Sequence, residues 1–378
     1  MIIGVDLRVL ASGQHSGVEE YTEQVVRHMV GLDAHISWRF ISLGRRGVPW
    51  RPWFDAPTIR RVHCGIPSSV GWLAGATVGW PRLDQVAGGV DVMFFPHLVL
   101  GAVSPQCPVV STWHDMSYEM MPEFLSPRQR LWHSIQMMPR WQAHRARHII
   151  CVSQSTARDV VSRYGIAEDR VRVIHSGVDT QCVRAGDEEI QAYRQAHRLP
   201  ERFVLALGTI EPRKNIEMLV SAFEEIASRT ACDLVIAGSH GWQAHALIRR
   251  IASSPVSSRI HVVGPVEPSQ RALLVSSADA VVYPSYLEGF GFPPLEALAC
   301  GVPVVASHTS AIAEVAGQWA VLVDPYRAQS VATGILYALE DQALRSRARL
   351  SARTVREKYS WETTAQKTLE VLTHSVLY

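Results

Sequence analysis

Residues 283–303 read YPSYLEGFGFPPLEALACGVP, and this stretch decides the fold. The apolar residues 280–283 that lead into it predict a buried strand. Gly289 and Gly291 allow a sharp turn whose backbone can lie close to a ligand. The two prolines that follow suit the first turn of a helix, and Gly301 is a usual helix terminator. The pattern therefore predicts a strand, a glycine turn and a helix in direct succession.

A turn of this kind can bind an anion, because the free N–H groups and the positive end of the helix dipole point at one place. Glu288 lies at the turn and Glu296 lies inside the helix, so two carboxylates flank that place. The combination suits a ligand that carries both phosphate and hydroxyl groups. The plainer interpretation is an ordinary buried strand–helix unit whose glutamates lie on a solvated helix face.

The length and composition indicate a globular protein with two domains. A chain of 378 residues, 47% apolar and 19% charged, is long enough to form two cores. The formal net charge is only +2, which gives no reason to expect a strongly anionic partner. No nucleic-acid-binding motif accompanies the arginines, so nucleic acid is not an expected partner.

The cysteines and the first residues predict a cytoplasmic location. The six cysteines are far apart and form no C-x-x-C pair, so we expect reduced thiols and no metal site. The opening Met-Ile-Ile-Gly-Val-Asp does not resemble a signal peptide. No apolar run approaches the ~18–20 residues of a membrane span. A soluble protein is therefore expected.

Strand-like and helix-like segments alternate along both halves of the chain. The expected strands are 2–6, 36–43, 91–95, 108–113, 148–152 and 171–175 in the first half, and 203–207, 233–237, 260–263, 280–283, 302–306 and 320–323 in the second. Helices are expected between them, including 17–31 after an N-capping Ser16 and one long helix over 127–144. Residues 44–89 give no consistent pattern. The alternation predicts two doubly wound parallel sheets joined near 177–186.

Glu288 and Glu296, eight positions apart around Gly-Phe-Gly, resemble the E-x7-E signature of the retaining GT-B glycosyltransferases of family 4. The resemblance implies an α/β GT-B fold, with two Rossmann-like doubly wound domains that face each other across a cleft. Residues 359–362, Y-S-W-E, are similar to the start of the family's last helix, which crosses back to the N-terminal domain. The implied domains are an acceptor-binding domain of residues 1–184 with 361–378, and a nucleotide-sugar-binding domain of residues 185–360.

A second motif, G-T-I-E-P-R-K-N at 208–215, ends a predicted strand and opens a helix, with Asn215 as the expected N-cap. Arg213 and Lys214 beside a helix N-terminus favour an anion, although a basic pair in a loop is more often simply solvated. The motif resembles the family's diphosphate-binding loop. This implies that Arg213 and Lys214 are catalytic and neutralise the leaving nucleoside diphosphate, a task that a metal performs elsewhere. Neither a metal nor a cofactor is then expected.

The same resemblance implies roles for the glycine turn and its surroundings. Glu296 is expected to bind the ribose hydroxyls, and Glu288 is expected to act as a catalytic residue that holds hydroxyls of the donor sugar. Gly238 and Val266 follow predicted strands and are expected near the nucleobase, with plain turn residues as an equal alternative. The complete set of expected donor-binding residues is Gly17, Gly238, Val266, Gly289, Phe290, Gly291, Leu295 and Glu296.

In the first half, His114 follows the predicted strand 108–113. A histidine at a strand end is more often structural, but this one corresponds to the family's active-site histidine, which implies a catalytic contact with the donor sugar. Asp115 would then orient its surroundings. Residues 12–17, S-G-Q-H-S-G, resemble the family's first glycine loop near the diphosphate. Some members have a further glycine two positions after the one that corresponds to Gly17, where this chain has Glu19.

Arginine and tryptophan are concentrated in the first half. Residues 34–83 hold seven arginines and five tryptophans against one acid, and residues 124–157 hold five more arginines and no acid. This mixture suits an anionic membrane face and a polyprenyl-diphosphate-linked sugar, while a solvated loop and helix face is the alternative. The residues are Arg39, Arg45, Arg46, Arg51, Arg60, Arg61, Arg82, Arg128, Arg130, Arg140, Arg145 and Arg147, with Trp38, Trp50, Trp53, Trp72 and Trp80.

Together these features predict a retaining, metal-independent glycosyltransferase that uses a nucleotide-sugar donor. No residue stands out as an enzymic nucleophile, and retention in this family is generally described as a front-face reaction. GDP-mannose is the leading donor, because the motifs resemble those of O-antigen mannosyltransferases. The expected acceptor is a saccharide or a polyprenyl-diphosphate-linked sugar of surface-glycan (lipopolysaccharide) synthesis, which allows peripheral contact with the inner membrane face.

Several alternatives stay open at this stage. UDP-glucose or UDP-N-acetylglucosamine are alternative donors, and sugar-nucleotide epimerisation is an alternative reaction on the same fold. A phosphorylase would need a lysine bound to pyridoxal phosphate, and the three lysines offer no good candidate. A dehydrogenase is disfavoured because no G-x-G-x-x-G follows the first strand. A catalytically silent partner subunit that binds sugar nucleotides is the alternative outside enzymes.

Overall fold

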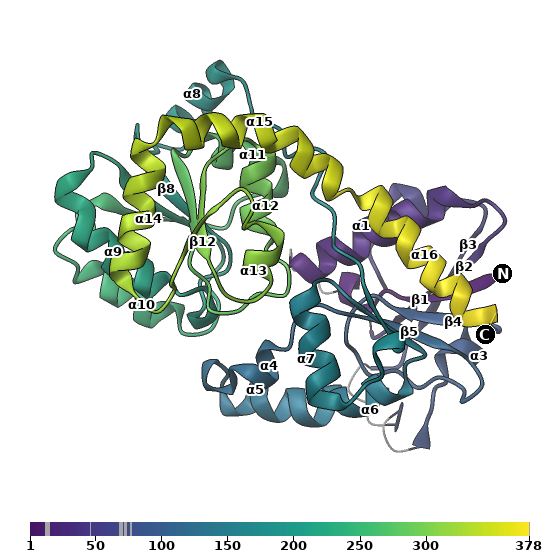
Figure 1. Ribbon diagram of the computed structural model, residues 1–378. Coiled ribbons are helices and arrows are strands. Elements are labelled where there is room, and N and C mark those ends of the chain that lie inside the picture. The colour runs from purple at the N-terminus through teal and green to yellow at the C-terminus, as the bar shows by residue number, and fades with distance from the viewer. Residues whose placement is uncertain (12–15, 46, 68–70, 72–73, 76–77, 378) are drawn as a thin grey trace. The chain divides into compact units, whose positions relative to one another are not determined.

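The computed structural model describes residues 1–11, 16–45, 47–67, 71, 74–75 and 78–377. The chain forms two compact units (Figure 1). Unit 1 comprises Met1–Gly177 with Ser360–Tyr378, and unit 2 comprises Val178–Tyr359. Both boundaries lie slightly earlier in the chain than the positions after 184 and 360 that the sequence indicated. None of the helices in the described residues is long and apolar enough to cross a membrane.

Unit 1 is built on a seven-stranded parallel sheet in the order β3-β2-β1-β4-β5-β6-β7. Its strands are β1 (Ile2–Asp6), β2 (Ser37–Leu43), β3 (Ile59–Cys64), β4 (Val92–Phe95), β5 (Val109–Trp113), β6 (His148–Cys151) and β7 (Val171–Val173). Its α-helices are α1 (Gly17–Leu32), α3 (Leu83–Val86), α4 (Ser117–Met120), α5 (Pro127–Leu131), α6 (Pro139–Arg145), α7 (Gln154–Tyr164) and α16 (Trp361–Leu377). The chain therefore returns to unit 1 after it has completed unit 2.

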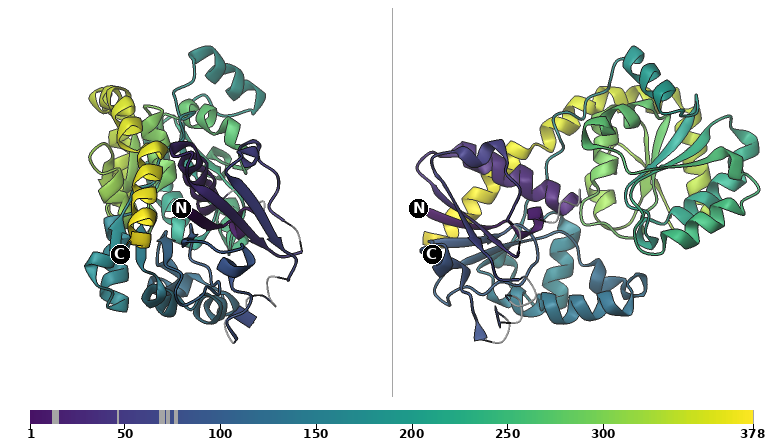
Figure 2. Two further views of the ribbon diagram at one scale, coloured as in Figure 1. Left: turned by 90° about the vertical axis from the view of Figure 1, so that its right-hand side faces the viewer. Right: turned by 180° about the vertical axis from the view of Figure 1, so that it is seen from behind.

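Helix α16 is an integral part of unit 1. It packs along α1 and against β4, β5 and β6, and Figure 2 shows it beside the N-terminal elements from both directions. The imidazole Nδ1 of His148 lies 2.8 Å from the hydroxyl of Ser375, and the hydroxyl of Thr364 donates to the carbonyl of His175 at 2.8 Å. A Cβ on Gly177 would lie 2.5 Å from the backbone nitrogen of Trp361, so this junction requires a glycine.

In unit 1, one strand was not predicted and one expected helix was wrong. Strand β3 was missed, because it pairs only with β2 and exposes Arg60 and Arg61, so no continuous apolar run marks it. The long helix expected over 127–144 is divided into α5, a π-helical turn over Trp132–Met137, and α6. Proline disfavours helical backbone in the residue before it and has no N–H of its own. Accordingly Met138, immediately before α6, has a left-handed backbone with φ of 40°.

Unit 2 is built on a six-stranded parallel sheet in the order β10-β9-β8-β11-β12-β13. Its strands are β8 (Phe203–Leu207), β9 (Asp233–Ala237), β10 (Ile260–Gly264), β11 (Ala280–Tyr283), β12 (Val304–Ser307) and β13 (Val321–Val323). Its α-helices are α8 (Asp187–Ala196), α9 (Ile216–Ile226), α10 (Ala244–Ala252), α11 (Pro268–Ser277), α12 (Phe292–Ala299), α13 (Ser310–Val315), α14 (Ala328–Glu340) and α15 (Gln342–Lys358).

The core of unit 2 explains why its strands are apolar throughout. Helices cover both faces of the sheet (Figure 1), so a central strand such as β8 or β11 is buried on both sides. One buried cluster joins the sheet to α9 and α14 through residues such as Phe223 and Ile335. A rigid core of this kind holds the loops at the strand ends in fixed positions, and those loops carry the candidate site.

Candidate active site

The candidate site lies where the strand order of unit 2 reverses. Strands β8 and β11 are neighbours in the sheet but far apart in the chain, and the connections on their two sides run in opposite directions. In sheets of this class, ligands bind outside the carboxyl ends of the strands at such a switch point. Arg213 and Lys214 follow the carboxyl end of β8, and Glu288 follows that of β11. The fold therefore brings the two sequence motifs together.

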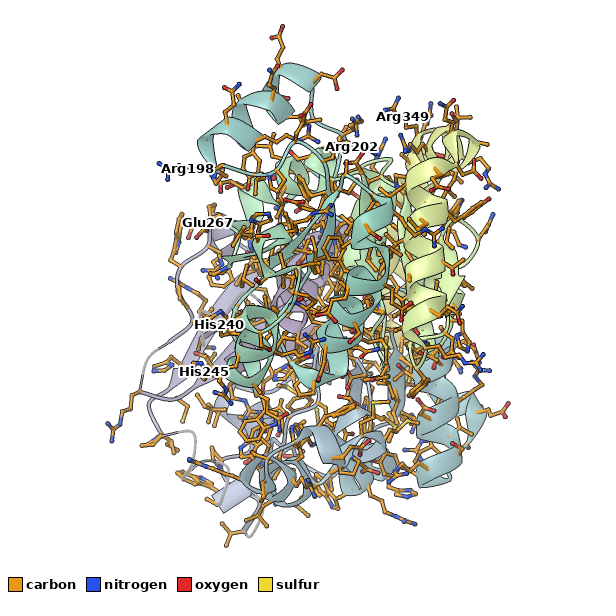
Figure 3. The ribbon with its side chains drawn as sticks, turned by 90° about the vertical axis from the view of Figure 1, so that its left-hand side faces the viewer. Arg198, Arg202, His240, His245, Glu267 and Arg349 are labelled. Atoms are coloured by element: carbon orange, nitrogen blue, oxygen red, sulfur yellow. The ribbon has the colours of Figure 1, made fainter. Side chains whose placement is uncertain are left out.

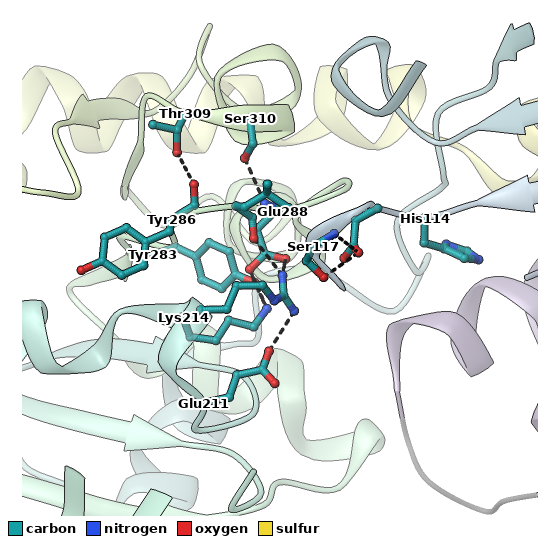
Figure 4. A network of polar contacts seen from close by, with 12 residues as sticks. His114, Ser117, Glu211, Lys214, Tyr283, Tyr286, Glu288, Thr309 and Ser310 are labelled. Carbon is teal, nitrogen blue, oxygen red and sulfur yellow. Dashed lines mark hydrogen bonds and ion pairs between the residues drawn. The ribbon is translucent and has the colours of Figure 1, made fainter. Parts of the chain in front are cut away.

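The carboxylate of Glu288 lies between the two cations. Arg213 Nη1 donates to Glu288 Oε2 at 2.8 Å, and Lys214 Nζ donates to Glu288 Oε1 at 2.7 Å. Tyr283, the last residue of β11, donates its hydroxyl to Glu288 Oε1 at 3.0 Å and lies 2.5 Å from Lys214 Nζ. Glu211 accepts from Arg213 Nη2 at 2.8 Å. The dashed lines of Figure 4 join these groups around Glu288, which we call the Glu288 cluster.

Burial and pairing set the charges in the Glu288 cluster. Burial opposes ionisation of Glu288, but Arg213 and Lys214 outweigh it and lower the pKa of this carboxyl to about 2. Burial lowers the pKa of Lys214 below its ordinary value, and Glu288 partly restores it. Burial and the nearby Glu288 raise the pKa of Tyr283 well above its ordinary value. At neutral pH the cluster therefore holds an ionised Glu288 and a neutral Tyr283.

The backbone on both sides of the cluster is cross-linked. The carbonyl of Arg213 accepts from the Tyr286 N–H at 3.0 Å, so the two loops are joined directly. The N–H of Glu288 donates to the hydroxyl of Ser310 at 3.0 Å, and Thr309 donates to the carbonyl of Tyr286 at 2.8 Å (Figure 4). Loops after β8, β11 and β12 are thereby held as one support for the carboxylate.

Asn215 stands at the start of α9, as expected, but its side chain does not cap the helix. Its backbone is left-handed, with φ of 58°, which turns the side chain away from the first helical N–H groups. The buried amide instead donates to the carbonyls of Pro284 and Pro325 at 3.0 and 2.7 Å. The predicted N-cap position is therefore confirmed without the capping hydrogen bond, and the residue ties the loop of Arg213 to two neighbouring loops.

Helix α12 begins at the glycine turn, as the sequence indicated. Gly291 has a φ of 95°, a conformation that favours glycine, and the two prolines occupy the first turn of the helix. Glu296 is 2% exposed, and its Oε1 accepts from Arg271 Nη1 of α11 at 2.6 Å. This ion pair was not expected from the sequence. Leu295 and Phe290 are buried as well, which gives both a packing role, and their contact with a donor stays a prediction.

Gly238 and Val266 follow the carboxyl ends of β9 and β10, at the same edge of the sheet. A Cβ on Gly238 would lie 1.9 Å from the carbonyl oxygen of Gly208, and its φ is 152°. The close approach of the β8 and β9 loops therefore requires a glycine here whatever binds nearby. Val266 is partly exposed. Their placement near a nucleobase stays a prediction.

In unit 1, His114 follows the carboxyl end of β5. Its Nε2 lies 2.9 Å from the carbonyl of Pro96, and because a carbonyl only accepts, Nε2 is the protonated nitrogen. Burial lowers the pKa of His114, so the ring is neutral at pH 7. Tyr21 of α1 packs edge-on against it at 4.8 Å between centroids. Asp115 accepts from the N–H and hydroxyl of Ser117 and so orders the loop (Figure 4).

The predicted glycine loop of residues 12–17 is only partly described. Residues 12–15 lie outside the described residues, as do Arg46 and Trp72 of the basic and aromatic set. Gly17 is the first residue of α1, where Ser16 and Glu19 form a capping box. The substitution of glycine by Glu19 in this chain thus has a local structural reason, since its side chain accepts from the Ser16 N–H.

Sequence reasoning missed four residues of the site, namely Glu211, Arg271, Tyr283 and Ser310. Tyr283 carried a signal, because a hydroxyl-bearing side chain ends an otherwise aliphatic buried strand. Arg271 and Ser310 carried none, since each depends on which helices become neighbours. Among the described residues, no three His, Cys, Asp or Glu side chains form a group that could hold a metal ion.

Two doubly wound parallel sheets in one chain, the second with charged loops at its switch point, agree with the GT-B fold expected from the sequence. Residues 187–355 match the family model "Glycosyl transferases group 1", and residues 15–181 match "Glycosyltransferase Family 4". The chain belongs to these glycosyltransferases, and the predicted family and fold class are confirmed.

The chain is similar to curated mannosyltransferases of Escherichia coli. The chain is 28% identical to O-antigen chain mannosyltransferase B of Escherichia coli over 263 residues, which cover 69% of this chain and 68% of that protein. It is 32% identical to the serotype-specific mannosyltransferase WbdA of Escherichia coli over 235 residues, 61% of this chain but only 29% of the relative's length.

The solved structures support the fold. Sucrose-phosphate synthase from Thermosynechococcus elongatus matches with a TM-score of 0.78 and 19% identity, over 99% of this chain and 98% of that one. HepE from Anabaena, solved with UDP-glucose, matches with a TM-score of 0.76 and 20% identity, over 99% and 100%.

Proposed function

We propose that the protein is a retaining, metal-independent mannosyltransferase that moves mannose from GDP-mannose to a saccharide or polyprenyl-diphosphate-linked acceptor in surface-glycan synthesis. The observation that carries the proposal is the Glu288 cluster, in which a carboxylate and two cations meet at the switch point of unit 2. The names of the O-antigen and serotype-specific mannosyltransferase relatives support the choice of mannose. Unit 1 would then bind the acceptor and unit 2 the donor.

The charge balance of the cluster suggests how donor binding works. Arg213 and Lys214 carry two positive charges, and Glu288 and Glu211 carry two negative ones, so the cluster is neutral without a ligand. A diphosphate brings negative charge of its own and competes for the same N–H donors. We infer that Arg213 and Lys214 turn towards the diphosphate when a donor binds. Glu288 then accepts hydrogen bonds from hydroxyls of the sugar in place of those from the two cations.

The reaction requires one bond exchange at the anomeric carbon. The bond from this carbon to the β-phosphate oxygen breaks, and a bond to the acceptor oxygen forms on the same face of the sugar. The hydroxyl proton of the acceptor passes to the leaving phosphate oxygen, and GDP departs. Arg213 and Lys214 stabilise the charge that develops on this oxygen, and His114, neutral and fixed by Pro96, is proposed to contact the sugar.

A panel of sugar nucleotides tests the donor. A donor that binds only the native state should add about 2.7 kcal/mol to the free energy of unfolding at 100 times its Kd. We expect GDP-mannose to give the largest thermal shift in the panel, and GDP release to depend on an added acceptor. Larger shifts with UDP-glucose or UDP-N-acetylglucosamine would contradict the choice of donor. Interconversion of sugar nucleotides without acceptor would indicate an epimerase, and binding without turnover would indicate a silent subunit.

Substitutions of Glu296 and Arg213 are expected to affect different quantities, namely nucleotide affinity and turnover. Glu296→Ala should weaken GDP binding by about tenfold or more, because a carboxylate that accepts from two ribose hydroxyls is lost. Arg213→Ala should lower kcat by roughly 10²- to 10³-fold with a smaller change in GDP affinity. Calorimetry with GDP and UDP on both variants separates the two effects. Unchanged nucleotide affinity in Glu296→Ala, with the fold intact by circular dichroism, would contradict the ribose assignment.

Exposed apolar and basic side chains on one segment of unit 1 support peripheral contact with an anionic membrane. In unit 1, Leu131, Trp132 and Trp141 are 59, 46 and 48% exposed on the segment that contains α5 and α6. The same segment carries Arg128, Arg130 and Arg140, and apolar rings among arginines suit the interface of an anionic bilayer.

Vesicle sedimentation tests this contact. The double variant Trp132→Ser and Trp141→Ser should bind phosphatidylglycerol vesicles at least about thirtyfold more weakly, since each buried ring contributes on the order of 1–2 kcal/mol. Tyr337→Ser is the control, because Tyr337 is an aromatic residue 45% exposed on α14 of unit 2, outside the basic and aromatic set. Equal vesicle binding by the double variant and the control would remove the membrane from the proposal.

A further inference from the structure

A cavity of about 660 Å³ lies in unit 2 at the edge of the sheet opposite to the Glu288 cluster. Its lining includes Ala278 and Asp279, immediately before β11, and Val302 and Pro303, immediately before β12. These are the amino ends of the strands, whereas the candidate active site lies at their carboxyl ends. The volume is within the range of roughly 300–1,000 Å³ that small-molecule sites occupy.

The walls of the cavity are rich in arginine. Five arginines line it against three acids: Arg184, Arg194, Arg198, Arg345 and Arg349, with Asp187, Glu201 and Asp279. One of the acids is already engaged outside the lining, because Asp279 accepts from Arg202 Nη2 at 3.2 Å and from the Phe203 N–H at 3.1 Å. The cavity therefore has more positive than negative charge at its walls.

Some of these arginine side chains bind backbone carbonyls and so have a structural role. Arg194 donates to the carbonyl of Ser277 at the end of α11, and Arg345 donates to the carbonyl of Leu339 near the end of α14. Arginines often bind the last carbonyls of a helix in this way. Arg184 donates to the carbonyl of Ser276 at 3.5 Å and lies 3.8 Å from Asp187. These contacts do not account for all the donors.

The remaining donors lack a protein partner. The Nε atoms of Arg194 and Arg345 are buried, and no other described residue accepts a hydrogen bond from them. The side chains of Arg198 and Arg349 are exposed, and their guanidinium groups form no ion pair or hydrogen bond with any residue that the structure describes. Figure 3 shows both of them, with Arg202, at the end of unit 2 that carries α8. The buried Nε donors of Arg194 and Arg345 cost free energy unless an acceptor joins them, whereas water solvates the exposed guanidinium groups of Arg198 and Arg349.

We propose that this cavity is a second binding site, for a ligand that bears a phosphate or diphosphate group. Arginine presents planar, paired N–H donors that match phosphate oxygens, and the arginines of α8, of the loops on either side of α8 and of α15 supply more than one such pair. The ligand is either a free phosphate compound or a lipid headgroup that presents the same group. The site is separate from the donor site and does not depend on the reaction proposed above.

Calorimetry with inorganic pyrophosphate at constant ionic strength tests the site. The titration is made in an Arg213→Ala background, so that pyrophosphate heat from the Glu288 cluster is minimised. One equivalent of pyrophosphate should bind, and adding Arg198→Ala and Arg349→Ala should weaken this binding at least about tenfold. The matched control is Arg353→Ala on α15, because Arg353 is 84% exposed and pairs with Glu357 outside the cavity. Thermal midpoints verify that each variant is folded.

The two ligand sources are separated by a vesicle arm. Binding of pyrophosphate that is lost with Arg198 and Arg349 assigns a soluble phosphate compound. Binding to phosphatidylglycerol vesicles but not to pyrophosphate, again lost with these two arginines and kept in the control, assigns a lipid headgroup. The proposal is overturned if neither probe binds, or if the Arg198 and Arg349 variant binds both probes as tightly as the Arg353 control. Donor turnover is not read in either arm, so failure of the mannosyltransferase proposal would leave this result intact.

Discussion

Glu288→Gln is expected to lower kcat/KM by about 10²- to 10³-fold, the largest effect that a single isosteric change should have on activity. The amide keeps the volume but not the charge, so Arg213 and Lys214 lose the anion that holds them 2.8 and 2.7 Å away. Steady-state kinetics with the donor from the thermal-shift panel measures the loss. Tyr283→Phe is the control, since it removes one hydrogen bond to the same carboxylate without removing a charge. A Glu288→Gln variant with native kcat/KM would show that the cluster is only structural.

The effect of Glu288→Gln on the free energy of unfolding should depend on pH. The pKa of Glu288 is lowered to about 2 in the folded protein, below the ordinary value of about 4.3 in the unfolded chain. The ionised carboxylate therefore stabilises the fold fully above about pH 4.3, by about 3 kcal/mol, and this contribution is lost as the pH falls towards 2. Denaturant unfolding of both proteins between pH 3 and pH 7 should show a difference that shrinks with acid. A constant difference would contradict the lowered pKa.

Gly238→Ala is expected to destabilise unit 2 by about 3 kcal/mol or more, because the new Cβ would overlap a backbone atom that cannot move alone. The atom in question is the carbonyl oxygen of Gly208, 1.9 Å from the ideal Cβ position. Gly264→Ala is the matched control, because Gly264 also has a positive φ, of 78°, but a Cβ there meets nothing within 4 Å. The control should lose only about 1 kcal/mol.

Urea unfolding of both glycine variants measures these losses. A similar cost at the two positions would show that the backbone conformation, rather than contact between the β8 and β9 loops, sets the requirement for glycine. A large loss of nucleotide affinity in a stable Gly238→Ala variant would instead support the predicted contact with a nucleobase.

Prediction from the sequence was most accurate for elements that a short run of consecutive residues determines. The strands of unit 2 are continuous apolar runs because helices cover both faces, and β8, β9 and β11 have the bounds that were expected. The meeting of Arg213, Lys214 and Glu288 followed from two loops at the carboxyl ends of parallel strands. The resemblance to a family added the roles of these residues, which stay predictions.

The features that could not be predicted from the sequence depend on contacts between residues that are distant in the chain. Arg271 pairs with Glu296 because α11 and α12 pack together. The amide of Asn215 binds the carbonyls of two loops instead of its own helix, since a left-handed backbone turns it away. Edge strand β3 was hidden by exposed arginines, and the break before Pro139 was hidden by an otherwise helical pattern.

The interleaved order of the two units has a consequence for biosynthesis. Unit 2 is continuous in sequence, so a ribosome has synthesised all of it by residue 359. In contrast, β4, β5 and β6 of unit 1 pack against α16, which is translated only afterwards. At about 5–20 residues per second, the roughly 200 residues from β7 to the end of α16 take about 10–40 s to synthesise, and the nascent first unit has that flank uncovered for this time. The later-made unit can therefore mature first, and the earlier one is the part that needs protection from aggregation during synthesis.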